Sequence, residues 1–335
     1  MKKILGMGNA LVDIMIPLES DEILKILDLP KGSMQLVDMQ RSNAILEALK
    51  NHERSFSAGG STANTIHGLA KLSVPTGYIG VIGEDELGGF FVQDMINAGV
   101  EPHMIHSRQE TGRAVALVTP DSERTFATFL GAAIELSAEH LAVGSRQSAY
   151  RIPHPASNIF QKYDYFHIEG YLVQNHDLMV TAVKLAKEYN LTVSIDLPSY
   201  NMVEANREFL WELIKSHIDI VFANEDEAKA ISGKDTMEAL DEISKICDIA
   251  IVKTGNKGSL IKSGKEIIPI GIIPVNLLDT TGAGDLYASG FLYALSTGKP
   301  LQKCGETGAL LAGNVIEVMG SKMTEERWIG IISLL

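Results

Sequence analysis

Hydrophobic residues in the second half of the chain form short unbroken runs separated by amphipathic stretches. Such runs predict buried strands, and they fall at residues 163–170, 191–197, 218–224 and 249–255. Helical patterns follow them, for instance at 176–190 and 225–232. Because apolar strands that alternate with helices are typical of βαβ units, the sequence predicts an α/β fold: a doubly wound, mainly parallel sheet flanked by helices.

The first half of the chain extends the same pattern. Residues 2–9 and 76–85 predict strands that end in glycine turns, and helices are expected at 57–72 and 86–99. The two histidines of the segment 103–106 have no carboxylate or third histidine beside them, so we expect surface side chains rather than a metal site.

Two segments, 10–38 and 108–131, do not share the strand–helix rhythm. The first predicts an edge strand interrupted by Pro17, and the second predicts a hairpin around a turn at 119–123. Together they predict a small second sheet that serves as a lid. The expected division is a core of residues 1–9, 39–107 and 132–335, and a small β lid of residues 10–38 and 108–131.

Charge and cysteine content limit the classes of partner. The formal net charge is -13, which argues against nucleic acid and predicts that any nucleotide arrives with a divalent cation. Cys247 and Cys304 are far apart, so neither a disulfide framework nor a zinc site is expected, and a cytoplasmic location follows. Polar residues interrupt the N-terminal apolar run, and no run of about 18 apolar residues occurs, so we expect no signal peptide and no membrane span.

Three common motifs fail on inspection. Gly6 and Gly8 are followed by Leu11 where a dinucleotide fingerprint needs a third glycine. No lysine follows glycines at the spacing of a phosphate-binding P-loop. The stretch around Ser61 resembles a hydrolase nucleophile elbow, with His176 and Asp177 available as partners, but a poor strand precedes it. A glycine turn that starts a helix is the better interpretation.

Polar residues and glycines lie at the expected strand ends, where ligands of doubly wound sheets bind. They are Gly8, Asn9, Asp196, Asn224, Gly255 and Asp279. Asn224 and Glu227 share one helical face and suit either a hydrated magnesium ion or an acidic first turn. Gly255 and Gly258 permit backbone N–H groups to approach an anion, although an ordinary turn explains them equally well.

The stretch from Asp279 to Asp285, DTTGAGD, precedes a helix that is apolar almost all round. Such a helix is buried, and glycines at its start predict an anion site formed by free N–H groups and the helix dipole. Asp285 lies within this site. The N–H groups and the dipole are expected to keep its carboxylate ionised. A simple helix cap is the alternative, but a cap does not require two aspartates six residues apart.

Taken together, these motifs resemble those of the ribokinase/adenosine kinase family, the PfkB-type carbohydrate kinases. DTTGAGD resembles the family's carboxyl-side signature, and GGSTANT (59–65) with GEDELG (83–88) resembles its amino-side signature. The N-x-x-E and TGxxG patterns occur between them in the expected order. The resemblance covers essentially the whole chain and implies a ribokinase-like fold with a small β lid.

The resemblance also implies roles at the reacting centre. Asp285 matches the base that accepts the proton of the acceptor hydroxyl, and the backbone N–H groups of Gly282, Ala283 and Gly284 match the hole for the moving γ-phosphoryl. The residues that match the acceptor-hydroxyl positions are Asn9, Asp13, Gly59, Gly60 and Asn64.

For the donor and the ions, the resemblance implies ATP with Mg²⁺ as cofactor. Positions on the ATP side are matched by Asn224, Thr254, Gly255 and Gly258. Asn224 and Glu227 match the pair that organises Mg²⁺ through water, and the backbone of Asp279 and Thr281 matches a K⁺ site.

The acceptor itself is the finest prediction. The segments around residues 8–14 and 122–133 resemble adenosine kinase more than ribokinase, and Arg124 matches an arginine of the lid. By this analogy Met34, Leu36, Tyr171 and Tyr200 wall a purine, although such residues near strand ends are usually core. Ala309 departs from the larger polar residue expected near the ATP adenine.

We therefore expect an ATP- and Mg²⁺-dependent kinase that phosphorylates the primary 5′-hydroxyl of adenosine. The alternatives are a kinase of ribose, fructose or a sugar acid, and a binding protein that regulates without turnover. The expected partner is a small molecule. Exposed strand edges in the lid leave both monomer and homodimer open.

Overall fold

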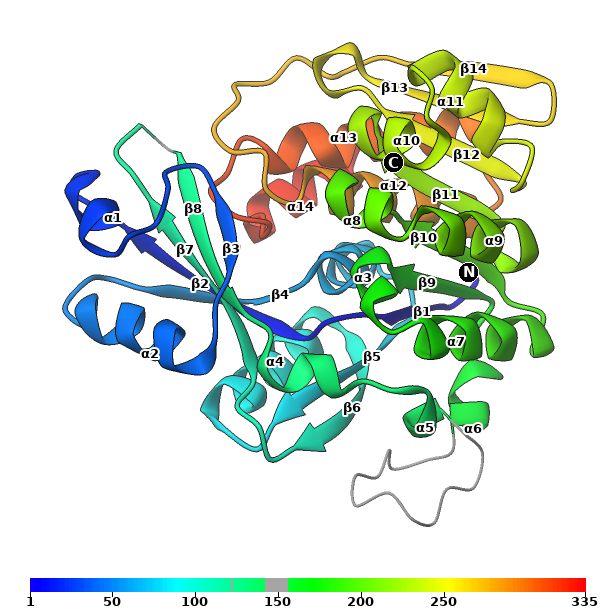
Figure 1. The fold of residues 1–335 in the computed structure, drawn as a ribbon. Helices are drawn as coiled ribbons and strands as arrows, with labels where there is room; N and C mark the ends of the chain where they lie inside the picture. The colour runs from blue at the N-terminus through cyan, green and yellow to red at the C-terminus, as the bar shows by residue number, and fades with distance from the viewer. Residues whose placement is uncertain (122, 142–155) are drawn as a thin grey trace.

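The structure is a computed structural model that describes residues 1–121, 123–141 and 156–335 (Figure 1). Residue 122, in the expected hairpin turn, and residues 142–155, in the expected core, lie outside the described residues.

The core is built on a nine-stranded sheet of order β14-β13-β12-β11-β10-β9-β1-β5-β6 (Figure 1). All neighbours from β12 to β6 pair in parallel, and β13 and β14 continue as antiparallel strands. The strands are β1 (Ile4–Met7), β5 (Thr76–Gly83), β6 (Val100–Ser107), β9 (Tyr165–Glu169), β10 (Thr192–Asp196), β11 (Ile220–Asn224), β12 (Ile249–Lys253), β13 (Ser259–Ser263) and β14 (Glu266–Ile270). The expected doubly wound sheet is confirmed.

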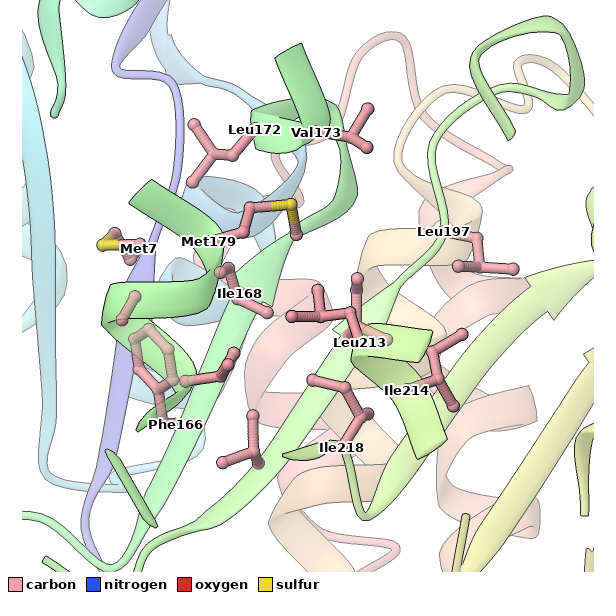
Figure 2. Packing of buried hydrophobic residues seen from close by; sticks show 14 of the residues in the cluster. Met7, Phe166, Ile168, Leu172, Val173, Met179, Leu197, Leu213, Ile214 and Ile218 are labelled. Atoms are coloured by element: carbon pink, nitrogen blue, oxygen red, sulfur yellow. The ribbon is translucent and has the colours of Figure 1, made fainter. Parts of the chain in front are cut away.

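Alternate residues of the central strands enter two hydrophobic cores, one on each face of the sheet. Leu5 and Phe166 join the core shown in Figure 2, whereas their neighbours Ile4 and Tyr165 join the opposite core. This alternation follows from the two-residue period of a strand. A sheet buried on both faces needs the unbroken apolar runs that the sequence contains.

Helices cover both faces. The helices of the first core are α5 (Ala138–Leu141), α6 (Ala156–Phe160), α7 (His176–Glu188), α8 (Tyr200–Ala205), α9 (Arg207–His217), α10 (Glu225–Ser232) and α11 (Thr236–Ile243). The helices of the opposite face are α3 (Ser61–Lys71), α4 (Glu86–Ala98), α12 (Ala283–Ser296) and α13 (Leu301–Val315), with α14 (Glu325–Ile332) packed outside them. Helix α12 is buried along most of its length, as its apolar sequence predicts.

A five-stranded second sheet of order β3-β8-β7-β2-β4 projects from the core (Figure 1). Its elements are β2 (Leu11–Pro17), β3 (Met34–Leu36), β4 (Ser55–Gly59), β7 (Gly112–Val118) and β8 (Arg124–Phe129), with α1 (Glu22–Ile26) and α2 (Met39–Ala48) beside them. The expected hairpin is present as the antiparallel pair β7 and β8. Strand β4 pairs with β2, although it lies in the segment 39–107 that we assigned to the core. We missed it because its weak apolar pattern gave no sign of a strand.

Two further expectations about strands are wrong. Strand β2 is an interior strand, since it pairs with β4 and β7. Its last two residues, Ile16 and Pro17, extend beyond the five residues paired with β4. Asp279 does not follow a strand; its N–H donates to the carbonyl of Ile316 in an irregular segment.

The expectation that His103 lies on the surface is wrong, and its place in strand β6 gives the reason. The alternation of β6 turns His103 inward, where it is buried and its Nε2 lies 3.1 Å from the hydroxyl of Tyr163, whereas His106 is exposed. No helix of the described residues has the length and apolar character needed to cross a membrane.

Candidate active site

Polar side chains from five neighbouring strands meet at the carboxyl edge of the large sheet. Asn9 follows β1, and the other four are the last residues of their strands: Glu169 of β9, Asp196 of β10, Asn224 of β11 and Lys253 of β12. All five line a cavity of about 770 Å³, called here the larger cavity. In the sheet, β5 lies next to β1 on one side and β10 lies next to β9 on the other, so the strand order reverses between β1 and β9. Ligands of open α/β sheets bind at such a reversal.

The floor of the larger cavity is polar and partly preorganised. Asn9 donates from Nδ2 to Oε1 of Glu169 at 2.6 Å, and the Thr62 N–H donates to the other carboxylate oxygen at 3.3 Å. Burial raises the pKa of Glu169 to about 7, although these hydrogen bonds act to lower it. The sequence analysis missed Glu169, although its place at the end of a buried strand was the available signal.

Asp13 and Asn64 line the larger cavity and come from different parts of the fold. Asp13 lies on β2 of the second sheet, and Asn64 lies in the first turns of α3. Burial raises the pKa of Asp13 to about 6, and Asp285 adds to this effect, while Lys322 and Arg124 oppose it. Of the expected glycines, Gly60 lines the cavity, and Gly59 is placed beside Asp13, where an added Cβ would meet Oδ1 at 2.3 Å.

Asp285 lies in the first turn of α12 with its carboxylate in the larger cavity. Ser61 Oγ donates to Oδ1 at 2.8 Å, and Asn64 Nδ2 donates to Oδ2 at 2.9 Å. Burial raises the pKa of Asp285 to about 6, with Asp196 contributing. The carboxylate is still mostly ionised at neutral pH, but it is a stronger base than its position beside a helix dipole led us to expect.

The turn before α12 carries the backbone N–H groups of the expected anion site. Gly282 caps the helix in the left-handed conformation with φ of 77°, which explains the glycine. Helix N–H groups at such an end lack partners within the helix. The Ala283 N–H donates to the Thr280 carbonyl at 3.2 Å, so it has to exchange this bond before it binds an anion.

Asn224 and Glu227 form a capping box at the start of α10. Asn224 Oδ1 accepts from the Glu227 N–H at 2.8 Å, and Glu227 accepts from the Asn224 backbone N–H at 2.8 Å. Both residues also line the larger cavity. Burial raises the pKa of Glu227 to about 8, with Lys253 opposing and Asp196 adding to the effect. The pair therefore has a structural task as well as the position expected of a ligand-binding pair.

A second cavity of about 510 Å³, called here the smaller cavity, lies on the other side of the α12 start. The turn after β12 supplies Gly255 and Gly258, and the helices supply Ala283, Gly284 and Ala309. The rest of its wall is mainly apolar, with Ile273, Val275, Leu277, Tyr287 and Ile316. Thr254 does not line it; its N–H donates to the Gly258 carbonyl at 2.8 Å and closes the turn.

Arg124 of β8 reaches from the second sheet to the segment before α12. It forms a buried ion pair with Asp279, and its Nη1 donates to Thr281 Oγ1 at 2.5 Å. Asp279 also accepts from the Gly320 N–H at 2.7 Å. Arg124 therefore links the second sheet to the segment before α12 and does not line the larger cavity. The side chains of Asp279 and Thr281 are engaged by Arg124, and backbone coordination of K⁺ stays a prediction.

Three of the four residues expected to wall a purine line the larger cavity, and their contact with a base stays a prediction. Met34, Leu36 and Tyr171 line the larger cavity, whereas Tyr200 is 55% exposed and lies outside its lining. Residues that the sequence analysis did not assign also line this cavity, among them Phe126, Thr128, Leu197 and Met202. Phe126 and Thr128 lie on β8, so they reach the cavity through a pairing of strands that the sequence pattern does not specify.

Solved structures and curated relatives agree with this architecture. Adenosine kinase from Sinorhizobium meliloti is 29% identical, with a TM-score of 0.86 over 100% of this chain and 99% of that one. A probable sugar kinase from Rhizobium etli is 30% identical, with a TM-score of 0.85 over 99% of this chain and 98% of that one. A nucleoside kinase of Methanocaldococcus jannaschii is 28% identical, over 83% of this chain and 85% of its own length.

The family model for the pfkB family carbohydrate kinases matches residues 32–327. That range contains both sheets except for β1 and β2 and nearly all of the cavity lining described above. Its members transfer a phosphoryl group from ATP, generally with Mg²⁺, to an alcohol group of a small molecule. The chain belongs to the pfkB family of carbohydrate kinases and is a phosphotransferase with an alcohol group as acceptor.

Proposed function

We propose that this kinase phosphorylates the 5′-hydroxyl of adenosine with Mg-ATP as donor. The observation that carries the proposal is that Asp285 lines a cavity with a polar floor, while Gly284 beside it also lines a cavity with apolar walls. The larger cavity receives the nucleoside and the smaller cavity receives the adenine end of ATP. Asp285 then lies where the acceptor hydroxyl and the γ-phosphoryl meet.

The shape of the larger cavity favours a nucleoside over a free sugar. Its floor carries Asp13, Asn64 and Glu169, which suit the hydroxyls of a ribose. Its outer wall carries Met34, Leu36, Phe126, Tyr171 and Met202, an apolar surface that a free sugar leaves uncovered. A volume of about 770 Å³ also exceeds what one sugar ring fills.

A kinase of ribose or fructose is the second candidate, and the polar floor is the observation that favours it. A sugar acid fits less well, because acidic side chains outnumber the one basic side chain, Lys253, in the described part of the cavity wall and disfavour a further anion. A regulatory protein without turnover has no use for a base at Asp285 with a raised pKa.

The positions of the side chains support a proposed role for each. The Asp285 carboxylate accepts the proton of the acceptor hydroxyl. Ser61 and Asn64 help to orient this carboxylate, because each donates a hydrogen bond to one of its two oxygens. The N–H groups of Gly282, Ala283 and Gly284 stabilise the charge on the phosphoryl oxygens. We propose that the second sheet closes over the acceptor, since Asp13, Met34 and Phe126 bring it into the cavity wall. Closure excludes water.

The donor set fits a magnesium ion that arrives on ATP. Within the described residues no three His, Cys, Asp or Glu side chains are grouped to hold a metal, but the carboxylates of Glu227 and Asp196 both line the larger cavity. Mg²⁺ keeps several waters and needs only one or two carboxylates besides phosphate oxygens. When bound, Mg²⁺ neutralises charge on the phosphates, and Glu227 and Asn224 would hold it through water.

The test is ADP release from Mg-ATP with adenosine, other nucleosides, ribose, fructose and a sugar acid as separate acceptors. We expect the highest kcat/KM with adenosine and AMP as its product. Release with free sugars alone would replace adenosine by the second candidate. Failure of every acceptor, with adenosine still bound, would favour a protein without turnover.

A further inference from the structure

Lys253 occupies a place that the proposed roles leave unexplained. It is the last residue of β12, and it lines the larger and the smaller cavity together with Gly255 and Gly284. Among the residues that the structure describes, it is the one Lys, Arg or His in the lining of either cavity. In a chain of net charge -13, a single ammonium group at the junction of two cavities is a marked local charge.

Asp196 holds this ammonium group in place. Lys253 Nζ lies 2.8 Å from Oδ1 and 3.0 Å from Oδ2 of Asp196, and the two side chains are 17% and 8% exposed. Burial alone would lower the pKa of Lys253, but Asp196 and Glu227 raise it above its ordinary value, so the group stays charged. An ammonium group has three N–H donors, and Asp196 can occupy at most two of them.

Gly284 leaves room for the ammonium group against the start of α12. A Cβ added to Gly284 would lie 3.0 Å from Lys253 Nζ, which is tighter than most real Cβ contacts. The ammonium group therefore lies against the backbone of the first turn of α12, beside the proposed anion site. A buried ion pair contributes little net stability because both charges lose water, so packing alone does not account for this one.

We propose that Lys253 is a catalytic residue that binds the transferred phosphoryl group as it passes from the smaller to the larger cavity, and that Asp196 is a positioning residue that aims it. The proposal rests on the proposed phosphoryl transfer. In that reaction a bond forms between the acceptor oxygen and the γ-phosphorus, and the bond from γ-phosphorus to the β–γ bridging oxygen breaks. The electron pair stays on ADP and the acceptor proton moves to Asp285. Lys253 neither gains nor loses a proton; it stabilises charge throughout.

The test compares Mg-ATP with Mg-ADP, because only ATP carries the group that Lys253 is proposed to bind. The first variant is Lys253→Met. The second is a double variant, Lys253→Met with Asp196→Asn, in which no buried carboxylate is left unpaired. The matched control is Lys229→Met, which removes an exposed lysine that pairs with Asp235 at 3.1 Å. Calorimetry gives both nucleotide affinities, ADP release gives kcat and KM, and urea denaturation checks folding.

We expect Lys253→Met to lower kcat about 100-fold, to leave the acceptor KM unchanged, and to weaken Mg-ATP binding while Mg-ADP binding is kept. The double variant should behave in the same way, and Lys229→Met should resemble the wild type. Equal loss of ATP and ADP affinity in the folded double variant, or an unchanged kcat, would overturn the proposal. If the wild type turns over no acceptor, the proposed function fails, and the comparison of ATP with ADP still decides whether Lys253 binds the terminal phosphoryl.

Discussion

Asp285→Asn should remove turnover and at the same time stabilise the folded protein at alkaline pH. The reason is that Asp285 has a pKa of about 6 in the folded protein, against an ordinary value of 3.8. Below about pH 4 the group is protonated in both the folded and the unfolded state. As the pH rises through about 6, the folded state acquires a buried charge, so the stability contributed by this group is lost.

The magnitude follows from the pKa difference. Each pKa unit corresponds to about 1.36 kcal/mol, so the full difference corresponds to about 3 kcal/mol of unfolding free energy. Asp285 is only partly buried and lines the larger cavity, so screening by solvent reduces this value. We therefore expect Asp285→Asn to raise the unfolding free energy by about 1 to 3 kcal/mol at pH 8. Near pH 4 protonated Asp and Asn both offer one acceptor and one donor group to Ser61 and Asn64, and the two proteins should be equally stable.

The assay is urea denaturation of the wild type and the variant at several pH values between 4 and 8. Asp235→Asn, at a side chain that is 90% exposed, is the matched control and should show no such trend. Turnover of Asp285→Asn should fall by about 10² to 10⁴, with acceptor binding retained in calorimetry. A stability difference that is the same at every pH would refute the buried-charge argument. Unchanged turnover would refute the assignment of Asp285 as the base.

Three further substitutions test the other parts of the site. Asp13→Ala should raise the acceptor KM about 10- to 100-fold and leave the KM for Mg-ATP unchanged; equal changes in both would mean that Asp13 does not contact the acceptor. Glu227→Gln should raise the Mg²⁺ concentration for half-maximal rate at least about tenfold, measured at fixed ATP, and an unchanged requirement would limit Glu227 to its capping task. Arg124→Met should lower the unfolding free energy by about 3 to 5 kcal/mol, because Asp279 is left buried and unpaired. Adding Asp279→Asn should recover much of this loss in urea denaturation, and no recovery would contradict the ion-pair argument.

The periodic parts of the fold were predictable because burial on both faces imposes a pattern on each strand separately. Strands β9 to β12 and helix α12 carry that pattern within their own residues. Strand β4 does not, since two of its five residues are exposed and its place depends on pairing with β2. Weak edge strands of this kind are specified by their partners.

The candidate site divides in the same way. Asp285 and its glycines were recognisable because their functions depend on spacing within seven residues. The Asp196–Lys253 pair joins residues 57 positions apart, and Arg124 meets Thr281 across 157 positions. In both pairs, the sequence around one residue does not predict its partner, so only the fold brings the two together. Glu169 and Lys253 end buried strands, and that position was the one local signal they had.

The electrostatics of the larger cavity restrict the form in which the nucleotide binds. Its wall carries the carboxylates of Asp13, Glu169, Asp196, Glu227 and Asp285, and Lys253 already pairs with Asp196. Burial raises the pKa of four of these acids, which shows that the cavity opposes further negative charge. A bare triphosphate would add to that charge, whereas its Mg²⁺ complex supplies compensating charge next to Glu227. ATP affinity should therefore depend steeply on Mg²⁺, and adenosine affinity, measured by calorimetry with and without Mg²⁺, should not. Equal dependence for both ligands would mean that Mg²⁺ acts on the protein rather than on the nucleotide.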